Sequence, residues 1–364
     1  MPNLLLCMTP GVGLRTWKEI GSINRELMPY REYVRKGWKV KILTYDAPDF
    51  PARYEDFDIV RIPFRKPYLF ALPWLNREAG RWADLVKTSQ STSAQYYTAA
   101  ASRWKKPILL RCGYVHGESL ECTQGRTPKT LRYQRKEARA FRAATHCQVP
   151  TAELADWVRT NYAVSGDKIS IVPNFVDTNI FRPADDVAGK PFSVISVGRL
   201  SPVKQFDLLI EACSGIENCR LTIVGEGAER ARLLALAQEK NVTLDLPGNI
   251  ANERIPALLS QHQVFALPSR WEGHPKSLIE AMACGMACVG VNSPGIRNVI
   301  EQGKNGLLSE GKPRELRAAL QSLLNDAELR KSLESSAREF VKENYAFQVV
   351  MDKELRIAES LVSR

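Results

Sequence analysis

The feature that most restricts the fold of this chain is a series of short apolar segments in its second half. The segments are 193–197, 220–224, 242–246, 264–267 and 287–291, and most run directly into Gly or Pro. They lack polar alternation, which is typical of strands buried on both faces of a parallel sheet. Helical spacing lies between them, as in the apolar stripe of Phe206, Leu209, Ile210 and Cys213. This alternation predicts a doubly wound α/β domain.

The first half shows the same alternation less regularly. Its expected strands are 4–8, 39–44, 85–88, 107–111, 146–149 and 170–173. The 364 residues suffice for two domains with substantial cores. We expect a first Rossmann-like domain over 1–186 and a second over 187–345, joined by a linker within 174–191. A final helix in 346–364 is expected to pack back on the first domain.

Composition excludes several classes of protein. No stretch approaches the roughly 18 apolar residues that span a bilayer, and the apolar start indicates a first strand rather than a signal peptide. Eight cysteines are scattered without a C-x-x-C pair, which favours buried thiols in a reducing cytosol over disulfides or a zinc site. We therefore expect a cytoplasmic protein without a bound metal or cofactor.

The net charge of +11 lies entirely in the first half. Up to Lys190 there are 30 Lys and Arg against 19 Asp and Glu, whereas the rest of the chain has 21 of each. A basic first half suits an anionic lipid surface, a pyrophosphate-carrying acceptor or nucleic acid. An ordinary solvated surface is the equally simple alternative.

Chemistry-bearing residues of the second half follow directly after its strands. In open parallel sheets, ligands bind beyond the carboxyl ends of the strands. Gly198, Arg199 and Lys204 follow the first strand, where two cations in one loop can converge on a diphosphate. Gly225 and Gly227 follow the second strand and permit close approach of a ligand to the backbone.

The segment after the fourth strand, 268–280, is the most informative. Pro275 suits the first turn of a helix, and Ser277 with Glu280 has the spacing of a capping box. The free N–H groups of such a helix start favour a phosphate. Glu272 precedes the helix and Glu280 lies one turn inside it, so one carboxylate can reach a sugar while the other accepts hydrogen bonds from a ribose. A capped helix with two solvated acids is the alternative.

In combination, these motifs resemble glycosyltransferase family 4, whose retaining enzymes have the GT-B fold of two Rossmann-like doubly wound domains facing a cleft. Glu272 and Glu280 form its E-x7-E pattern. Val-Gly-Arg-Leu-Ser-Pro-Val-Lys at 197–204 and Ile-Val-Gly-Glu-Gly at 223–227 are similar to its other motifs, and 172–183 resembles its interdomain segment. The resemblance covers almost the whole chain and implies sugar transfer from a nucleotide-diphosphate donor, UDP- or GDP-linked.

The resemblance also implies roles for residues at the donor site. Arg199 and Lys204 would neutralise the departing diphosphate in place of a metal ion. Glu272 would hold the sugar hydroxyls and Glu280 the ribose. With front-face attack, the donor phosphate itself would accept the proton of the acceptor. The other implied donor-binding residues are Gly198, Gly225, Gly227, Gly248, Asn249, Gly273, His274, Pro275, Lys276 and Ser277.

The first half resembles the acceptor side of the family less closely. Gly13 and Trp17 match the loop after the first strand. Gly113 or Tyr114 stands where many relatives carry an active-site histidine, and His116 is shifted along the chain. We therefore interpret His116 as a loop or structural histidine rather than a catalytic one. The acceptor is expected to be a glycan or lipid-linked hydroxyl in surface polysaccharide assembly.

Three other patterns are given less weight. Gly11 and Gly13 form only part of a dinucleotide-binding fingerprint. Asp56 and Asp58 have the D-x-D form of a metal site, but they precede a strand in the wrong half. The segment 64–74 mixes cations with aromatic residues, which suits either peripheral contact with the inner face of a membrane or a loop of the core.

Two other functions remain as alternatives. A different GT-B enzyme, such as a nucleotide-sugar epimerase or a phosphorylase, would share the architecture. A non-catalytic nucleic-acid-binding protein would use the basic first half, but no recognisable nucleic-acid motif is present. We therefore expect a glycosyltransferase with no nucleic-acid partner.

Overall fold

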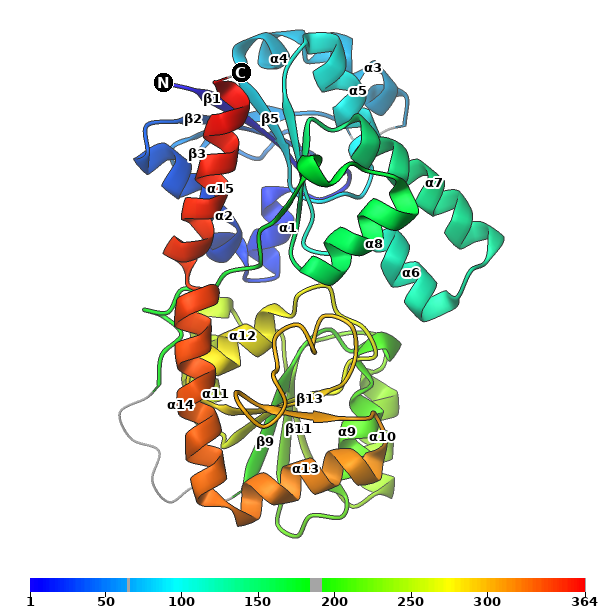
Figure 1. The fold of residues 1–364 in the computed structure, drawn as a ribbon, viewed down its shortest axis with the longest axis vertical. Helices are drawn as coiled ribbons and strands as arrows, with labels where there is room; N and C mark the ends of the chain where they lie inside the picture. Colours follow the sequence, from blue (N-terminus) through cyan, green and yellow to red (C-terminus); the bar gives the residue numbers. More distant parts are fainter. Residues whose placement is uncertain (64–65, 184–191, 364) are drawn as a thin grey trace. The chain divides into compact units, whose positions relative to one another are not determined.

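The computed structural model describes residues 1–63, 66–183 and 192–363, which form two compact α/β units (Figure 1). Unit 1 comprises Met1–Pro173 together with Met351–Arg364, and unit 2 comprises Asn174–Val350. Each unit has one largely or wholly parallel sheet and its own apolar core. The expected fold class is therefore confirmed, whereas a cleft between the two domains stays a prediction.

The chain passes into unit 2 earlier than the expected limit at residue 186. Val176 and Phe181 are buried in a core of unit 2, and Val176 pairs with Ala346 in an isolated parallel bridge. Burial of these side chains makes the segment part of the second unit rather than a free linker. Residues 184–191 of the expected linker lie outside the described residues.

The sheet of unit 1 has the order β3-β4-β2-β1-β5-β6-β7-β8, and only the β3–β4 pair is antiparallel. The short edge strand β3 was not expected, and β4 begins at Phe57, so that Asp58 lies within the strand that it was expected to precede. The strands are β1 (Asn3–Cys7), β2 (Lys39–Thr44), β3 (Arg53–Tyr54), β4 (Phe57–Arg61), β5 (Leu85–Thr88), β6 (Ile108–Arg111), β7 (His146–Val149) and β8 (Ile169–Ile171).

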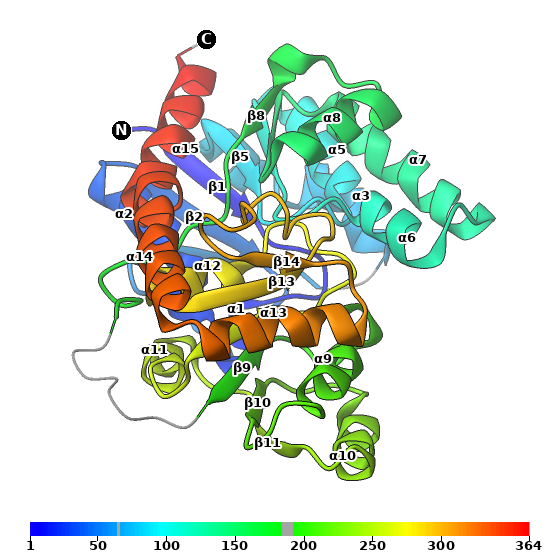
Figure 2. The same ribbon diagram turned by 60° about the horizontal axis from the view of Figure 1, so that its bottom comes forward.

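Helices cover both sides of this sheet. Figures 1 and 2 show α2 and α15 on one side and α3, α5, α7 and α8 on the other. The helices are α1 (Leu14–Glu19), α2 (Ile23–Arg35), α3 (Lys66–Leu75), α4 (Arg77–Trp82), α5 (Ala94–Trp104), α6 (His116–Gln124), α7 (Pro128–Ala143), α8 (Ala152–Tyr162), η1 (Gly166–Lys168) and α15 (Phe347–Val362). The last helix contributes Glu354, whose carboxylate forms a buried ion pair with Lys87 of β5.

The sheet of unit 2 is entirely parallel, with the order β11-β10-β9-β12-β13-β14. Its strands are β9 (Ser193–Val197), β10 (Arg220–Val224), β11 (Thr243–Gly248), β12 (Val264–Leu267), β13 (Ala287–Val291) and β14 (Leu307–Ser309). The helices are η2 (Pro202–Lys204), α9 (Phe206–Cys213), α10 (Arg230–Glu239), η3 (Asn252–Arg254), α11 (Ile255–Leu259), α12 (Lys276–Ala283), α13 (Pro313–Asn325) and α14 (Ala327–Asn344).

The strand order of unit 2 determines where a ligand can bind. From β9 the chain winds outward through β10 to β11, whereas β12 lies on the other side of β9 and leads to β13 and β14. The connections therefore diverge between β9 and β12, and doubly wound proteins bind ligands outside the carboxyl ends of the strands at such a switch point. The loops that follow β9 and β12 are the two with the most chemistry-bearing residues in the sequence.

Candidate functional site

Lys204 and Glu272 meet at the switch point of unit 2. Lys204 ends the loop after β9, and Glu272 lies in the loop after β12. The Lys204 Nζ donates a hydrogen bond to Glu272 Oε1 at 2.6 Å, and the two side chains are 18% and 13% exposed. An ion pair with so little exposure is screened less than a surface pair, and an anionic ligand would compete with the carboxylate for the ammonium group.

Arg199 stands in the same loop but in different surroundings. Its side chain is exposed, and its guanidinium has no hydrogen-bond or ion-pair partner within the described ranges. Gly198 lies beside it, and a Cβ at Gly198 would be 3.2 Å from the Lys204 side chain. The loop thus presents one cation that is free to move and one that is fixed by Glu272.

The helix start after Glu272 has no side-chain cap. Helix α12 begins at Lys276, with Pro275 as its N-cap residue and no cap hydrogen bond from a side chain. The expected capping box of Ser277 and Glu280 is therefore wrong, because both residues lie inside the helix. Backbone N–H groups and the positive end of the helix dipole point outward at a helix start, and a phosphate suits such a position.

Glu280 is buried on α12, with 4% of its surface exposed. Its Oε1 accepts a hydrogen bond of 3.0 Å from the side-chain amide of Asn252 in η3. Asn252 was not among the expected site residues, because nothing in the sequence connects the third and fourth strand-end loops. The contact fixes the orientation of a carboxylate that the family resemblance assigns to the ribose.

The loop after β13 supports the backbone of Glu272. The Glu272 N–H donates to the Pro294 carbonyl at 3.0 Å. A Cβ at Gly295, which has a φ of +82°, would lie 2.2 Å from the Glu272 carbonyl oxygen, so only glycine fits there. Sequence reasoning missed both positions, although a Ser-Pro-Gly turn directly after a strand could have indicated them.

His274 is a buried structural element of the same loop. Its carbonyl accepts a hydrogen bond of 2.8 Å from the Asn174 side chain, and its ring lies edge-on to Tyr345 with the centroids 4.8 Å apart. Burial lowers the pKa of the imidazole to about 3, so the ring is neutral at physiological pH. The ring therefore acts in packing, and the adjacent backbone positions Gly273 and Pro275.

Gly225 and Gly227 are required by contact between two loops. A Cβ at Gly225 would lie 2.0 Å from the Gly198 carbonyl oxygen, and one at Gly227 would lie 2.2 Å from the Leu200 carbonyl oxygen. The Gly225 N–H in turn donates to the Gly248 carbonyl at 2.9 Å. The glycines thus let the loops after β9, β10 and β11 pack together. The sequence alone had indicated close approach of a ligand as the role of these glycines instead. Asn249, the next residue, is exposed.

In unit 1, a carboxylate occupies the helix start that follows β1. Asp46 accepts hydrogen bonds from the backbone N–H groups of Leu14 at 2.8 Å and Arg15 at 3.0 Å. A Cβ at Gly13 would lie 2.2 Å from the same carboxylate. Asp46 therefore fills the place where a dinucleotide phosphate would bind in a complete fingerprint. Trp17 is half-buried further along α1.

A second buried carboxylate, that of Glu137, holds the start of α6. Its oxygens accept hydrogen bonds from Gly117 N at 2.7 Å, His116 N at 3.3 Å, Ser91 Oγ at 2.7 Å and Tyr162 Oη at 2.6 Å. Because α6 has the apolar Val115 as its N-cap residue, Glu137 supplies the missing cap from another helix. No local sequence pattern indicates this network, because its members lie on four separate segments of the chain.

Three of the expected acceptor-side residues, Gly113, Tyr114 and His116, lie at the start of α6. The Gly113 N–H donates to the Gln90 side chain at 2.9 Å. The half-buried ring of His116 lies between Tyr114 and Tyr133, with centroid distances of 5.9 and 4.6 Å. Burial lowers the pKa of His116, against an opposing contribution from Glu137. His116 is thus a neutral, packed imidazole, and a role toward an acceptor stays a prediction.

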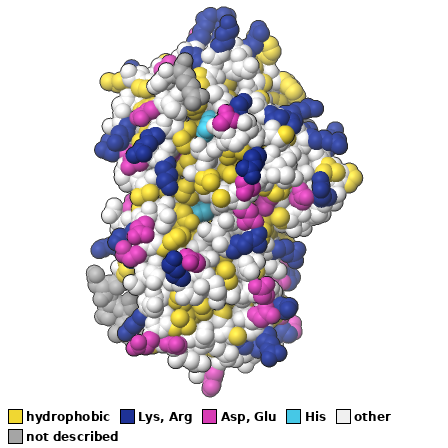
Figure 3. Space-filling view, viewed as in Figure 1, with side chains coloured by type: hydrophobic (Ala, Val, Ile, Leu, Met, Phe, Trp, Pro, Cys, Tyr) yellow, Lys and Arg dark blue, Asp and Glu magenta, His cyan; other side chains and the backbone are white. Residues whose placement is uncertain are grey.

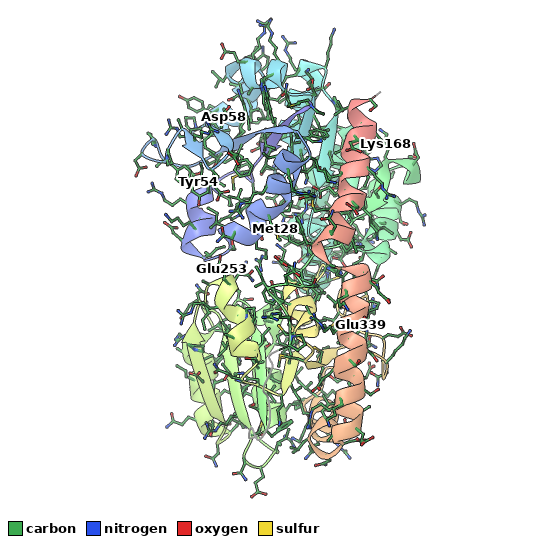
Figure 4. All side chains as sticks on the ribbon, turned by 90° about the vertical axis from the view of Figure 1, so that its left-hand side faces the viewer. Met28, Tyr54, Asp58, Lys168, Glu253 and Glu339 are labelled. Carbon is green, nitrogen blue, oxygen red and sulfur yellow. The ribbon has the colours of Figure 1, made fainter. Side chains whose placement is uncertain are left out.

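Asp56 and Asp58 lie near cations. Asp58, labelled in Figure 4, is 3.9 Å from the Lys41 ammonium, and Asp56 is 3.9 Å from Arg53. Both carboxylates are largely exposed. Groups of three or more potential metal ligands are absent from the described residues.

The two parallel-sheet units define a doubly wound α/β protein of the GT-B type, and comparisons with known proteins specify the family. Residues 177–340 match the family model described as glycosyl transferases group 1, and residues 30–180 match glycosyltransferase family 4. The chain belongs to the family 4 type of glycosyltransferases.

Curated relatives are similar over parts of their length. The D-inositol 3-phosphate glycosyltransferase of Acidothermus cellulolyticus is 27% identical over 65% of this chain and 58% of its own. An N-acetylgalactosaminyltransferase of Campylobacter jejuni that acts on a diphospho-undecaprenol substrate is 32% identical over 51% of this chain and 52% of its own. The chain thus spans little more than half the length of these relatives.

Solved structures show the fold over the whole chain. Sucrose-phosphate synthase from Thermosynechococcus elongatus has a TM-score of 0.83 at 19% identity, and the match covers 100% of both chains. Alr3699/HepE of Anabaena, solved in complex with UDP, has a TM-score of 0.80 at 17% identity with the same coverage. These structures share the GT-B fold.

Proposed function

We propose that this protein transfers a sugar from a UDP-linked donor to a hydroxyl of a glycan or lipid-linked acceptor, with retention of the anomeric configuration. The observation that carries the proposal is the Lys204–Glu272 pair at the switch point, directly before the uncapped start of α12. Solved relatives in complex with UDP and UDP-glucose support the choice of donor. The names of the curated relatives support an acceptor in glycan assembly.

The reaction breaks the bond between the anomeric carbon and the donor phosphate oxygen and forms a bond to the acceptor oxygen. Negative charge accumulates on the leaving diphosphate, which accepts the proton of the acceptor hydroxyl. Lys204 would exchange Glu272 for this diphosphate, and Arg199 is free to approach it. Fixed cations near a leaving group stabilise the transition state without a metal ion. Glu272, released from Lys204, would then accept hydrogen bonds from the sugar hydroxyls.

The direct test is a panel of UDP and GDP sugars with the purified protein. A ligand that binds only the native state raises the melting temperature, so UDP sugars should raise it more than GDP sugars. Transfer should persist in excess EDTA, and NMR of the product should show the anomeric configuration of the donor. No thermal shift with any nucleotide sugar would contradict the proposal.

Lys204→Ala should lower turnover by about 100-fold, the scale of losing one positioned electrostatic stabiliser. Lys240→Ala is the matched control, because Lys240 pairs with Glu239 in unit 2, away from the strand-end loops. Circular dichroism should be the same for both variants. Near-normal turnover of Lys204→Ala on its donor would refute the assignment.

A further inference from the structure

Most of the positive charge on helix α7 of unit 1 has no acidic residue beside it. The segment 126–142 contains seven Lys or Arg and a single acid, Glu137. The Glu137 carboxylate points inward, where it accepts hydrogen bonds from Ser91, Gly117 and Tyr162. The one acid in this segment therefore does not neutralise the outer surface of the helix.

The cations occupy the outer face of α7. The buried face is formed by Thr130, Gln134, Glu137 and Phe141, which follow helical spacing. The exposed cations on the other face are Lys129, Arg132, Arg135, Lys136, Arg139 and Arg142. Burial of one face thus forces the basic residues of the helix into a single exposed stripe.

These cations have few partners. Arg126, just before the helix, pairs with Glu121 at 3.5 Å, and Arg142 donates to the Tyr162 carbonyl at 3.3 Å. For the cations between them, the described part of the chain provides no ion pair. A row of unpaired cations attracts an extended anionic surface.

Exposed apolar side chains lie on the same side of unit 1. Helix α5 packs against both α3 and α7. On α3, Phe70 is 67% exposed and Trp74 is 61% exposed, and the Arg103 guanidinium of α5 lies 5.3 Å from the Trp74 ring centroid. Figure 3 shows Lys and Arg side chains beside hydrophobic ones over this part of the surface. Arg65, in the segment 64–74, lies outside the described residues.

We propose that the basic–aromatic surface, formed by Phe70 and Trp74 of α3, Arg103 of α5, and Arg132, Arg135 and Arg139 of α7, docks unit 1 on an anionic lipid bilayer. Cations beside exposed aromatic rings suit the boundary between headgroups and acyl chains. Across the described residues, no helix is long and apolar enough to cross a membrane. The docking is peripheral and does not rest on the proposed donor chemistry.

The structure separates two contributions to this docking. Each Lys or Arg near an anionic surface strengthens binding by roughly fivefold at low salt, and the effect fades within a Debye length. Replacement of three α7 cations should therefore weaken binding by about 100-fold. Phe70 and Trp74 contribute through apolar burial, which salt does not screen.

The test is co-sedimentation of the full chain with vesicles. Phosphatidylglycerol-rich vesicles are compared with pure phosphatidylcholine vesicles at about 50 mM and about 500 mM salt, which differ several-fold in Debye length. The first variant is Arg132→Gln/Arg135→Gln/Arg139→Gln. Its matched control, Arg220→Gln/Arg314→Gln/Lys331→Gln, removes three exposed cations from unit 2. The second variant, Phe70→Ser/Trp74→Ser, removes the exposed rings.

We expect the native chain and the unit 2 control to bind anionic vesicles at low salt and to be largely released at high salt. The α7 variant should lose the binding to anionic vesicles at low salt. The aromatic variant should lose the residual binding that the native chain keeps at high salt. Thermal shift with UDP sugars should be unchanged in all variants, since none touches the switch point. Equal pelleting with both vesicle types, equal binding by the α7 variant and its control, or binding to a random oligonucleotide without binding to vesicles would each overturn the proposal.

Discussion

Glu272 and Glu280 belong to one motif, but the structure places them in different surroundings. Glu272 is partly exposed and paired with the Lys204 ammonium, whereas Glu280 is buried and held by Asn252. A carboxylate that changes partners during the reaction and one that is fixed beforehand should affect different kinetic constants.

We therefore expect Glu280→Gln chiefly to weaken nucleotide binding, and Glu272→Gln chiefly to lower kcat. The measurements are calorimetric affinity for UDP and steady-state kinetics on the same preparations. Asn252→Ala should weaken UDP binding in the same way as Glu280→Gln but to a smaller extent, because it removes the hydrogen bond that orients the Glu280 carboxylate. If UDP affinity falls for Glu272→Gln and is unchanged for Glu280→Gln, the two roles are reversed.

His274 should make stability depend on pH. Burial lowers the pKa of His274 to about 3 in the folded protein, whereas an unfolded chain has a histidine pKa of about 6.5. The unfolded state therefore takes up the proton first as the pH falls below about 6.5, and the free energy of unfolding decreases. Between pH 7 and pH 5, protonation of this one histidine in the unfolded state should lower the free energy of unfolding by about 2 kcal/mol.

The measurement is urea unfolding of the native chain and of His274→Phe at both pH values. Phenylalanine preserves an aromatic contact with Tyr345 but cannot be protonated. The variant should lose less stability on acidification than the native chain. Equal losses in the two proteins would show that the imidazole is protonated without unfolding.

At the scale of elements, two helix starts in unit 1 are capped by carboxylates from elsewhere in the chain. Asp46 caps α1 and Glu137 caps α6, where neither Gly13 nor Val115 offers a capping side chain. These caps fix the loops before the helices, which contain the expected acceptor-side residues Gly13 and Gly113. The loop geometry thus depends on residues that have no direct role toward a ligand.

Glu137→Gln should lower the free energy of unfolding by about 2–3 kcal/mol. The carboxylate accepts from four donors, and an amide presents an NH₂ group to some of them, which leaves buried donors unpaired. Urea unfolding measures the change, and Glu78→Gln on the exposed surface of α4 is the control. A loss as small as that of the control would mean that the network contributes little.

At the scale of the whole molecule, unit 1 is completed by the last residues of the chain. Glu354 of α15 pairs with Lys87 of β5, and their side chains are only 5% and 1% exposed. The Lys87 ammonium also lies 5.0 Å and 5.4 Å from the ring centroids of Tyr30 and Tyr33. Burial lowers the pKa of Lys87, and the negative charge of Glu354 partly offsets this shift.

Removal of one partner of a buried ion pair typically costs 3–5 kcal/mol, because the remaining charge is buried alone. Glu354→Leu should therefore destabilise unit 1, whereas the double variant Lys87→Met/Glu354→Leu should recover most of the loss. Limited proteolysis should cut unit 1 of the single variant before unit 2. Equal stability of the single and double variants would show that the pair itself is not the cause.

The sequence by itself determined the fold class, most strands and the strand-end loops in which we propose the donor site. Apolar runs that end in Gly or Pro mark strands buried on both faces, and parallel topology brings the residues after each strand to one edge. Arg199, Lys204, Glu272 and Glu280 could be selected on this basis because they lie in or next to those loops.

Only the tertiary structure decided which of these residues meet and what holds them. The Lys204–Glu272 and Asn252–Glu280 contacts, the glycine close approaches and the Glu137 network join segments far apart in the chain. Edge strand β3 escaped prediction because its two residues, Arg53 and Tyr54, form no apolar run. Local patterns record which face of an element is buried, whereas the partner on that face depends on strand order and loop packing, which no local pattern contains.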